Sequence, residues 1–191
     1  GDDFRFGCDR AGDFAFLQEA GQRLNFSVEP TATVEIDGQR ISSTRLRSAL
    51  AEADFVLARR LLGRPYAIDG RVMHGKKLGR TLNAPTANVQ LKRHRAPLHG
   101  VYLVSVQLDN GRHLPGVANI GTRPTVDTTQ QAHLEVHVLD FSGDLYGQHI
   151  AVTFHKKIRD EQRFESLSQL QQAIAADIAK AHTLWQHFHT L

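Results

Sequence analysis

The sequence of 191 residues has very little cysteine and no long apolar run. Its one cysteine, Cys8, excludes an internal disulfide, so nothing in the sequence requires an oxidising compartment. No apolar stretch approaches the ~18 residues of a membrane-spanning helix, and no positively charged signal segment opens the sequence. Internal repeats and low-complexity segments are lacking as well. We therefore expect a cytoplasmic protein with no membrane partner.

Charge of one sign is not concentrated in any part of the sequence. The formal net charge is +3, and basic residues form only short clusters such as Lys76-Lys77 and Lys92-Arg93. A nucleic-acid-binding protein more often gathers them on one helix or stripe, interleaved with aromatic residues, so we expect no nucleic-acid partner. A modest positive balance suits an enzyme with a polyphosphate substrate. The sequence gives no basis for an oligomeric state.

The sequence changes character at Gly63, where we predict a domain boundary between residues 1–62 and 63–191. The first part has a β-prone stretch from Val28 to Ile36 and a helical pattern from Leu46 to Leu61, split where Asp54 would cap a second helix. Gly63-Arg64-Pro65 ends this pattern, because proline disfavours a helical residue before it.

Short strands with turns between them dominate the second part. The predicted strands are Tyr66–Met73, Val101–Leu108, His113–Asn119, His133–Leu139 and Ile150–Phe154. Asp109-Asn110-Gly111 predicts a hairpin with a type I′ turn, because Asn-Gly accepts positive φ angles. Apolar residues at three- and four-residue steps from Leu167 to Phe188 predict a final helix, capped by Ser166 and Gln169. This pattern is typical of an antiparallel barrel or sandwich followed by a helix.

A basic, glycine-rich segment, His74 to Arg80, follows the first of these strands. Its ammonium and backbone N–H groups suit phosphate binding, although the same composition is common in surface loops. It does not match the P-loop pattern. In the next stretch, Thr86 and Asn88 point to one side if the chain is extended, and two neutral oxygen ligands suffice for Mg²⁺ when ATP supplies the rest. On composition alone, a turn-closing Asn88 is the simpler interpretation.

His133, Glu135 and His137 would share one face of a strand. Glu135 would then serve as a general base that deprotonates a hydroxyl for attack on phosphorus. The same three side chains would also suit a transition metal. An exposed polar face of an edge strand explains the pattern equally well.

Two further segments are candidates for a site on loops. Gly116–Thr125 contains two glycines and a proline that would shape a loop, with Asn119 among its polar groups. Ile158–Phe164 is charged and comes just before the final helix. Each segment would either border a pocket or simply connect two elements.

In this order, these segments resemble the riboflavin kinase family from about Leu61 onward. The matching motifs are Gly63–Tyr66, the basic glycine segment, Pro85–Asn88, Gly100–Tyr102, the Asn119 loop, Glu135–Phe141 with Tyr146-Gly147, and Ile158–Leu167. Each motif is weak alone, and the ordered set is highly specific. One departure is Asn83-Ala84, where bacterial relatives usually have Gly-Phe; asparagine tolerates the turn, but the aromatic contact is lost.

The resemblance implies a mainly β fold, an antiparallel Greek-key barrel with a C-terminal helix, and transfer of the ATP γ-phosphate to the 5′-hydroxyl of riboflavin. Glu135 would activate that hydroxyl, and Thr86 and Asn88 would hold Mg²⁺ and the ATP phosphates. The flavin would lie near Asn119, Arg159 and Phe164. The other ATP-binding residues that the family pattern implies are Gly75, Lys76, Lys77, Gly79 and Arg80.

Residues 1–62 resemble the closing part of the FMN adenylyltransferase half of bifunctional riboflavin kinase/FAD synthetases. Gly1–Gly7 and Ile41–Arg47 match its motifs, and the matching phosphate-binding residues are Ser42, Ser43, Thr44 and Arg47. The histidine-containing nucleotide motif of that half has no counterpart in this sequence. We therefore expect an α/β nucleotidyltransferase-like remnant in a chain that makes FMN but not FAD, and a longer parent protein that makes both.

Three other classes stay open on the residues alone. A non-catalytic flavin-binding barrel would bind riboflavin without needing ATP. A transition-metal enzyme would use His133, Glu135 and His137. A nucleic-acid-binding barrel would show salt-dependent binding.

Overall fold

The structure, a computed structural model, describes residues 4–74, 86–91, 96–124 and 130–188. The chain divides into two compact units, Gly1–Ser42 and Ser43–Leu191. The two helices that follow Ser42 therefore belong to the same unit as the strands after them. The division between the units lies 20 residues before the domain boundary that the sequence predicts, between residues 62 and 63. The assignment of residues 1–62 and 63–191 to two domains stays a prediction.

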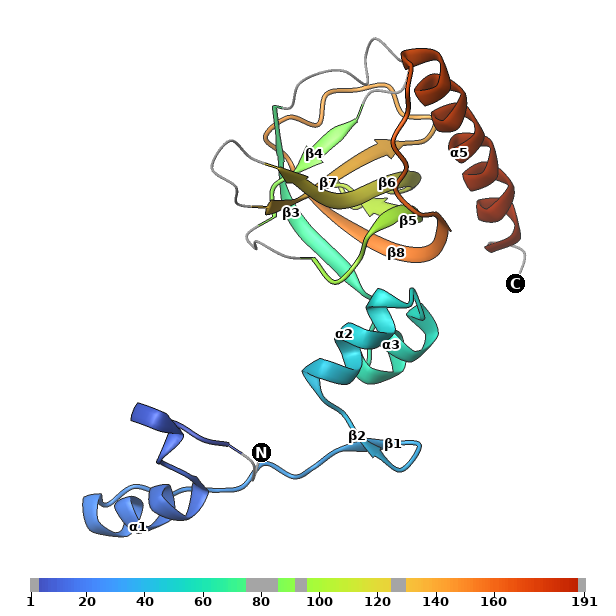
Figure 1. Cartoon of the computed structure of the whole chain (residues 1–191). Coiled ribbons are helices and arrows are strands. Elements are labelled where there is room, and N and C mark those ends of the chain that lie inside the picture. Colours follow the sequence, from blue (N-terminus) through green and yellow to red (C-terminus); the bar gives the residue numbers. More distant parts are fainter. Residues whose placement is uncertain (1–3, 75–85, 92–95, 125–129, 189–191) are drawn as a thin grey trace. The chain divides into compact units, whose positions relative to one another are not determined.

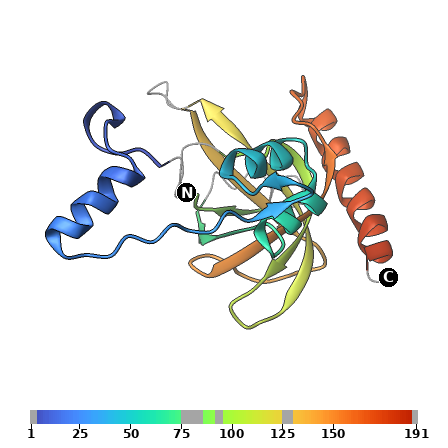
Figure 2. The same cartoon turned by 90° about the horizontal axis from the view of Figure 1, so that it is seen from below.

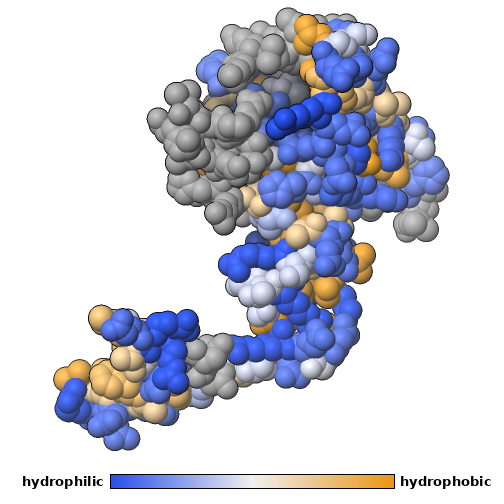
Figure 3. Space-filling view, in the orientation of Figure 1, coloured by the Kyte–Doolittle hydropathy of each residue, from blue (hydrophilic) through white to orange (hydrophobic). Residues whose placement is uncertain are grey.

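The first unit consists of short elements. They are η1 (Cys8–Arg10), α1 (Phe14–Leu24), β1 (Glu35–Ile36) and β2 (Gln39–Arg40). The Asp13 carboxylate caps α1 by accepting the Phe16 N–H at 2.9 Å, and this hydrogen bond is the main cause of the lowered pKa of Asp13. The strand expected from Val28 to Ile36 is limited to its last two residues. Apolar side chains of α1 such as Phe16 and Leu24 are exposed. Figure 3 shows orange, hydrophobic surface on this unit.

The second unit begins with two short helices, α2 (Ser43–Ala51) and α3 (Phe55–Leu62). They confirm the predicted split at Asp54, whose carboxylate accepts the Leu57 N–H at 2.9 Å and so caps α3. Gly63 ends α3 in the left-handed conformation, with φ of 69°, which a glycine adopts without strain.

Removal of the α3 cap is expected to destabilise this unit. Asp54→Ala would leave the N–H of Leu57 without its acceptor and lower the free energy of unfolding by about 1 kcal/mol. Asp54→Asn, which keeps a side-chain oxygen at the same place, is the matched control. Urea titration followed by circular dichroism measures both variants, and equal midpoints for Ala and Asn would show that the cap does not contribute.

Six strands then form a closed barrel in which every neighbouring pair is antiparallel (Figures 1 and 2). The strands are β3 (Ala67–Met73), β4 (Ala87–Val89), β5 (Gly100–Gln107), β6 (His113–Pro124), β7 (Gln130–Val138) and β8 (His149–Arg159). Their order around the barrel is β3-β4-β7-β6-β5-β8. Alternate side chains such as Val104, Ile120 and Val136 are fully buried and fill the interior. The mainly β, antiparallel barrel that the family resemblance implies is confirmed, and of the two architectures that the strand pattern left open, barrel and sandwich, the barrel is correct.

The hairpin between β5 and β6 is confirmed, but its predicted type I′ turn is wrong. Of the three loop residues, only Gly111 has a positive φ, 79°. The Gly111 N–H donates to the Leu108 carbonyl at 2.9 Å, and the Leu108 N–H donates to the Arg112 carbonyl at 2.9 Å. A three-residue loop that ends in a left-handed glycine closes the hairpin equally well and needs only one residue with positive φ.

The loop predicted at Gly116–Thr125 is also corrected, because β6 continues as a strand through Pro124. Its pairing with β7 runs without interruption from Gly116, opposite Val138, to Pro124, opposite Gln130. The glycines therefore do not break the strand. At Gly121, the missing side chain makes room for a neighbouring segment, as described below.

The final helix, α5 (Leu167–Phe188), lies against the outside of the barrel in both views (Figures 1 and 2). Ala181 is fully buried in a cluster with strand residues including Val101 and Val117. The Ser166 hydroxyl accepts the Gln169 N–H at 3.2 Å, which confirms the predicted cap. Leu167 is 67% exposed and falls outside the apolar stripe. Among the helices of the described ranges, none is both long and apolar enough for a membrane span.

Candidate active site

Glu135 lies at the centre of a row of cross-strand neighbours on the outer face of the barrel. On one side β4 places Asn88 directly opposite Glu135, and on the other β6 places Asn119 opposite it. Leu134 and Val136 are buried, at 1% and 0% exposure, whereas Glu135 is half-buried, so its side chain points outward. Neighbouring strands lie about 4.8 Å apart, so Asn88 and Asn119 are each within contact range of Glu135.

Thr86 lies two residues before Asn88 and is half-buried like it. Because side chains alternate along an extended chain, Thr86 falls on the side of Asn88. The donor set along β4 and β7 is therefore a hydroxyl, an amide oxygen and a carboxylate. Oxygen donors of this kind fit Mg²⁺, which prefers oxygen ligands and takes others from phosphates and water.

The arrangement along β7 does not resemble a transition-metal site. Alternate residues of a strand lie about 6.6 Å apart, so His133, Glu135 and His137 do not converge on one ion. Within the part of the chain that the structure describes, no three His, Cys, Asp or Glu side chains are grouped to hold a metal. β7 also lies between β4 and β6, so the interpretation as an edge strand is wrong.

The amide oxygen of Asn119 is buried and has no hydrogen-bond partner among the described residues. A buried acceptor without a donor costs about 1–3 kcal/mol, so such groups usually meet a ligand or an ordered water. The row therefore contains a hydrogen-bond acceptor without a partner on the strand next to Glu135.

One connecting segment, residues 160–164, borders this row. Two residues after Asn119 on β6 comes Gly121, which lies on the same face of the strand and is paired with His133. A side chain at 121 would overlap the Glu161 carboxylate, which therefore lies directly against the strand. Sequence reasoning singles out the charged segment but not Glu161 itself, because only the lack of a side chain at Gly121 hints at the contact.

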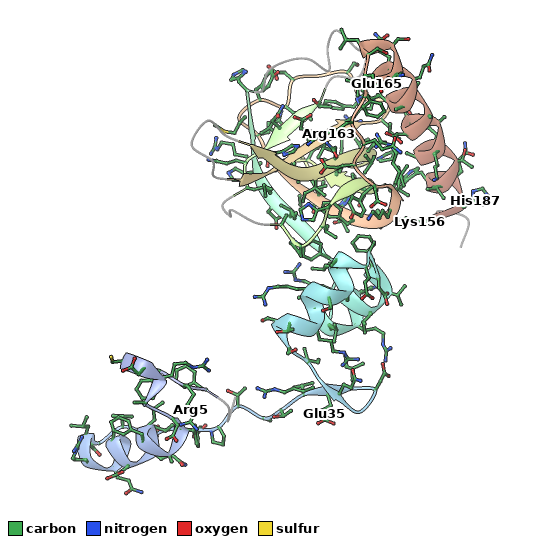
Figure 4. The ribbon with its side chains drawn as sticks, viewed as in Figure 1. Arg5, Glu35, Lys156, Arg163, Glu165 and His187 are labelled. Atoms are coloured by element: carbon green, nitrogen blue, oxygen red, sulfur yellow. The ribbon has the colours of Figure 1, made fainter. Side chains whose placement is uncertain are left out.

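Arg159 and Phe164 stand at the two ends of this segment. Val101 is the cross-strand partner of both Asn119 and Arg159, so the row continues across β5 to β8. The Arg159 guanidinium is bound to Asp177 of α5, with its carbon 5.7 Å from the centre of the Phe164 ring. Figure 4 marks the course of the segment from β8 to α5 by Arg163 and Glu165.

The Gly100–Tyr102 motif is structural in this fold. Tyr102 is fully buried, its hydroxyl donates to the His99 carbonyl at 2.8 Å, and burial raises the pKa of Tyr102. Gly100 has φ of 122°, and a Cβ there would lie 2.6 Å from the Arg159 carbonyl. Only glycine allows so close an approach of the two strands.

The basic segment with Gly75, Lys76, Lys77, Gly79 and Arg80 lies outside the described residues, as does Asn83-Ala84. Ser42 lies directly before α2, and Ser43, Thr44 and Arg47 are exposed in its first turns.

Comparisons with known proteins match both parts of the chain. A family described as riboflavin kinase matches residues 62–185, and one described as FAD synthetase matches residues 1–45. The bifunctional riboflavin kinase/FMN adenylyltransferase of Pseudomonas fluorescens is 64% identical over 184 residues, covering 96% of this chain and 59% of that protein. The protein of the same name from Escherichia coli (strain K12) is 56% identical over 177 residues, covering 93% and 56%. The chain thus spans less than two thirds of the length of these relatives.

A solved structure matches as well. A crystal structure from Streptococcus pneumoniae, titled as a macrolide-efflux protein, superposes with a TM-score of 0.70 at 33% identity. The match covers 95% of this chain and 58% of that one.

Proposed function

The chain belongs to the riboflavin kinase family, and we propose that it transfers the γ-phosphate of ATP to the 5′-hydroxyl of riboflavin, giving FMN and ADP. The observation that carries the proposal is the cross-strand row of Asn88, Glu135 and Asn119. It places one carboxylate between two neutral polar side chains on the outer face of the barrel. A phosphotransferase needs these elements, because the protein mainly positions the reactants and balances charge.

Glu135 is proposed as the general base. Its carboxylate would accept the proton of the riboflavin 5′-hydroxyl as that oxygen attacks the γ-phosphorus. The bond between the γ-phosphorus and the oxygen of the ADP leaving group breaks, and ADP carries that electron pair away. Because Glu135 is half-buried, solvent competes only partly for its hydrogen bonds.

Thr86 and Asn88 are proposed to hold Mg²⁺ together with the ATP phosphates. The ion, when bound, neutralises negative charge on the phosphates and orients them. Thr86 and Asn88 are both neutral, so they leave the charge of the ion available for the nucleotide. The basic, glycine-rich segment from Gly75 to Arg80 would also bind the ATP phosphates, through its ammonium and backbone N–H groups.

The flavin is proposed to lie beside Asn119 and Phe164. The buried amide oxygen of Asn119 suits a donor such as a ring N–H, and the half-buried Phe164 offers an apolar surface. Arg159 enters this proposal as the residue that contacts Phe164.

A second activity is proposed for a longer protein that contains this sequence. Residues 1–45 match the FAD synthetase family, and the relatives are named for FMN adenylyltransferase activity as well. Such a protein would adenylylate FMN to FAD, with Ser42, Ser43, Thr44 and Arg47 binding ATP phosphates.

The kinase proposal predicts a magnesium-dependent product. Incubation of the chain with riboflavin, ATP and Mg²⁺ is expected to yield FMN, separated from riboflavin by chromatography. FMN formation should stop when EDTA is added and resume with excess Mg²⁺, because the ATP phosphates need the ion to neutralise their charge. Folded protein that binds riboflavin but forms no FMN would instead identify a flavin-binding barrel without kinase activity.

A further inference from the structure

A partly buried ion pair joins α5 to the end of β8, next to the candidate site. The Arg159 Nε donates to the Asp177 Oδ1 at 2.9 Å, and Nη2 donates to Oδ2 at 2.7 Å. The side chains of Arg159 and Asp177 are only 22% and 9% exposed. This two-point contact fixes the plane of the guanidinium as well as its position.

The third guanidinium nitrogen extends the contact to the segment that borders the row. Nη1 of Arg159 donates to the Asp160 carbonyl at 2.9 Å, and the guanidinium carbon lies 5.7 Å from the centre of the Phe164 ring. Lys157 forms an ion pair with the Asp160 carboxylate at 2.6 Å. Residues 160–164 belong to neither helix nor strand, so these side-chain contacts contribute strongly to their position.

The same segment reaches the row through Glu161, whose carboxylate lies against Gly121. Gly121 is two residues from Asn119 on the same face of β6. A displacement of residues 160–164 would therefore move Glu161, which lies against Gly121, and Phe164, which is proposed to contact the flavin. Among the described residues, Asp177 is hydrogen-bonded to Arg159, and Arg159 in turn contacts residues 160–164.

We propose that Asp177 is a positioning residue for riboflavin, which acts by holding Arg159 and, through it, residues 160–164 beside the row of Asn88, Glu135 and Asn119. The inference rests on the proposed riboflavin kinase function for the identity of the ligand. The ion pair itself and its connection to residues 160–164 do not depend on that function. Asp177 touches neither reactant in this proposal.

Asp177→Asn tests the proposal, because asparagine keeps the size of the side chain and removes its charge. Riboflavin binding, measured by quenching of flavin fluorescence, is expected to weaken by about 10- to 100-fold, the range that small misplacements in a site produce. The KM for ATP is expected to stay within about twofold, because Asn88 on β4 and Thr86 directly before β4 lie on the other side of Glu135. Amide hydrogen exchange at residues 160–164 is expected to become faster.

Lys180→Met is the matched control. Lys180 lies one turn beyond Asp177 on α5 and donates to the Ile158 carbonyl at 2.9 Å, so it also joins α5 to β8. It does not contact Arg159 through that bond, so riboflavin affinity and exchange at 160–164 should stay near those of the unmodified chain. Asp177→Glu keeps the charge, so its riboflavin affinity and its exchange rate at residues 160–164 should lie between those of the unmodified chain and those of Asp177→Asn. If circular dichroism shows that Asp177→Asn is unfolded, Asp177→Glu replaces it as the test variant.

The proposal would be overturned if Asp177→Asn changed neither the affinity for riboflavin nor the rate of amide hydrogen exchange at residues 160–164. Equal losses of riboflavin and ATP affinity, shared by Lys180→Met, would overturn it too, because they would indicate a purely structural role. Failure of the kinase proposal has a different signature. The unmodified chain would then form no FMN, while hydrogen exchange would still report whether Asp177 holds residues 160–164.

Discussion

Glu135→Gln is expected to lower kcat for FMN formation by about 10²–10⁴-fold, the usual loss when a general base is removed. Glutamine occupies the same volume between Asn88 and Asn119 and keeps one oxygen, but it does not accept the hydroxyl proton. The KM for ATP and the affinity for riboflavin should change little. Steady-state kinetics with both substrates, together with direct nucleotide titration, would measure the three quantities separately.

Glu165→Gln is the control for this experiment. Glu165 is an exposed carboxylate just before α5, and it is not part of the row. Its variant is expected to keep the full kcat. If Glu135→Gln lost ATP affinity in parallel with kcat, Glu135 would be a metal ligand or a structural residue, and the role of base would have to be abandoned.

Asn88→Ala is expected to weaken magnesium-dependent ATP binding by about 10- to 100-fold. A loss of this size is expected when a bond from the protein to a charged group is removed. Asn88 is directly opposite Glu135, and its side chain is half-buried on the outer face of the barrel. An alanine there fits the strand but supplies no oxygen. ATP binding measured over a range of Mg²⁺ concentrations would separate loss of the metal from loss of direct phosphate contact.

Asn88→Asp distinguishes a ligand from a strand residue. Aspartate retains an oxygen at the same position, so it should keep magnesium-dependent binding, whereas alanine should not. If the two variants bound ATP alike, and both like the unmodified chain, Asn88 would have no part in holding the ion. The simpler interpretation that composition alone favours would then be correct.

The sequence predicts the local elements well because their causes are local. The cap at Asp54 and the left-handed end at Gly63 depend on residues within a few positions of one another. The alternation of apolar and polar residues along β7 likewise predicts that Glu135 shares a face with His133 and His137.

Contacts between distant segments are harder to predict. Nothing local indicates that β4 pairs with β7, which is what brings Asn88 opposite Glu135. The pairing of Arg159 with Asp177 joins residues from a strand end and the middle of a helix, and neither residue type signals the other. The family resemblance places Arg159 near the site, but only the fold reveals that its guanidinium is bound to α5. The type of the β5–β6 turn also depends on how the two strands twist together rather than on Asn110-Gly111 alone.

The length of β4 links catalysis to the integrity of the fold. With three residues it is the shortest strand of the barrel, and its ladder pairs only two positions with β3 and three with β7. Every other pair of neighbouring strands has a longer ladder, so we expect the barrel to open most easily at β4. A ligand that binds Asn88 and Glu135 together would link β4 to β7. Substrate binding would then stabilise the pairing of β4 with β7, and the free energy of binding would add to the stability of the closed barrel.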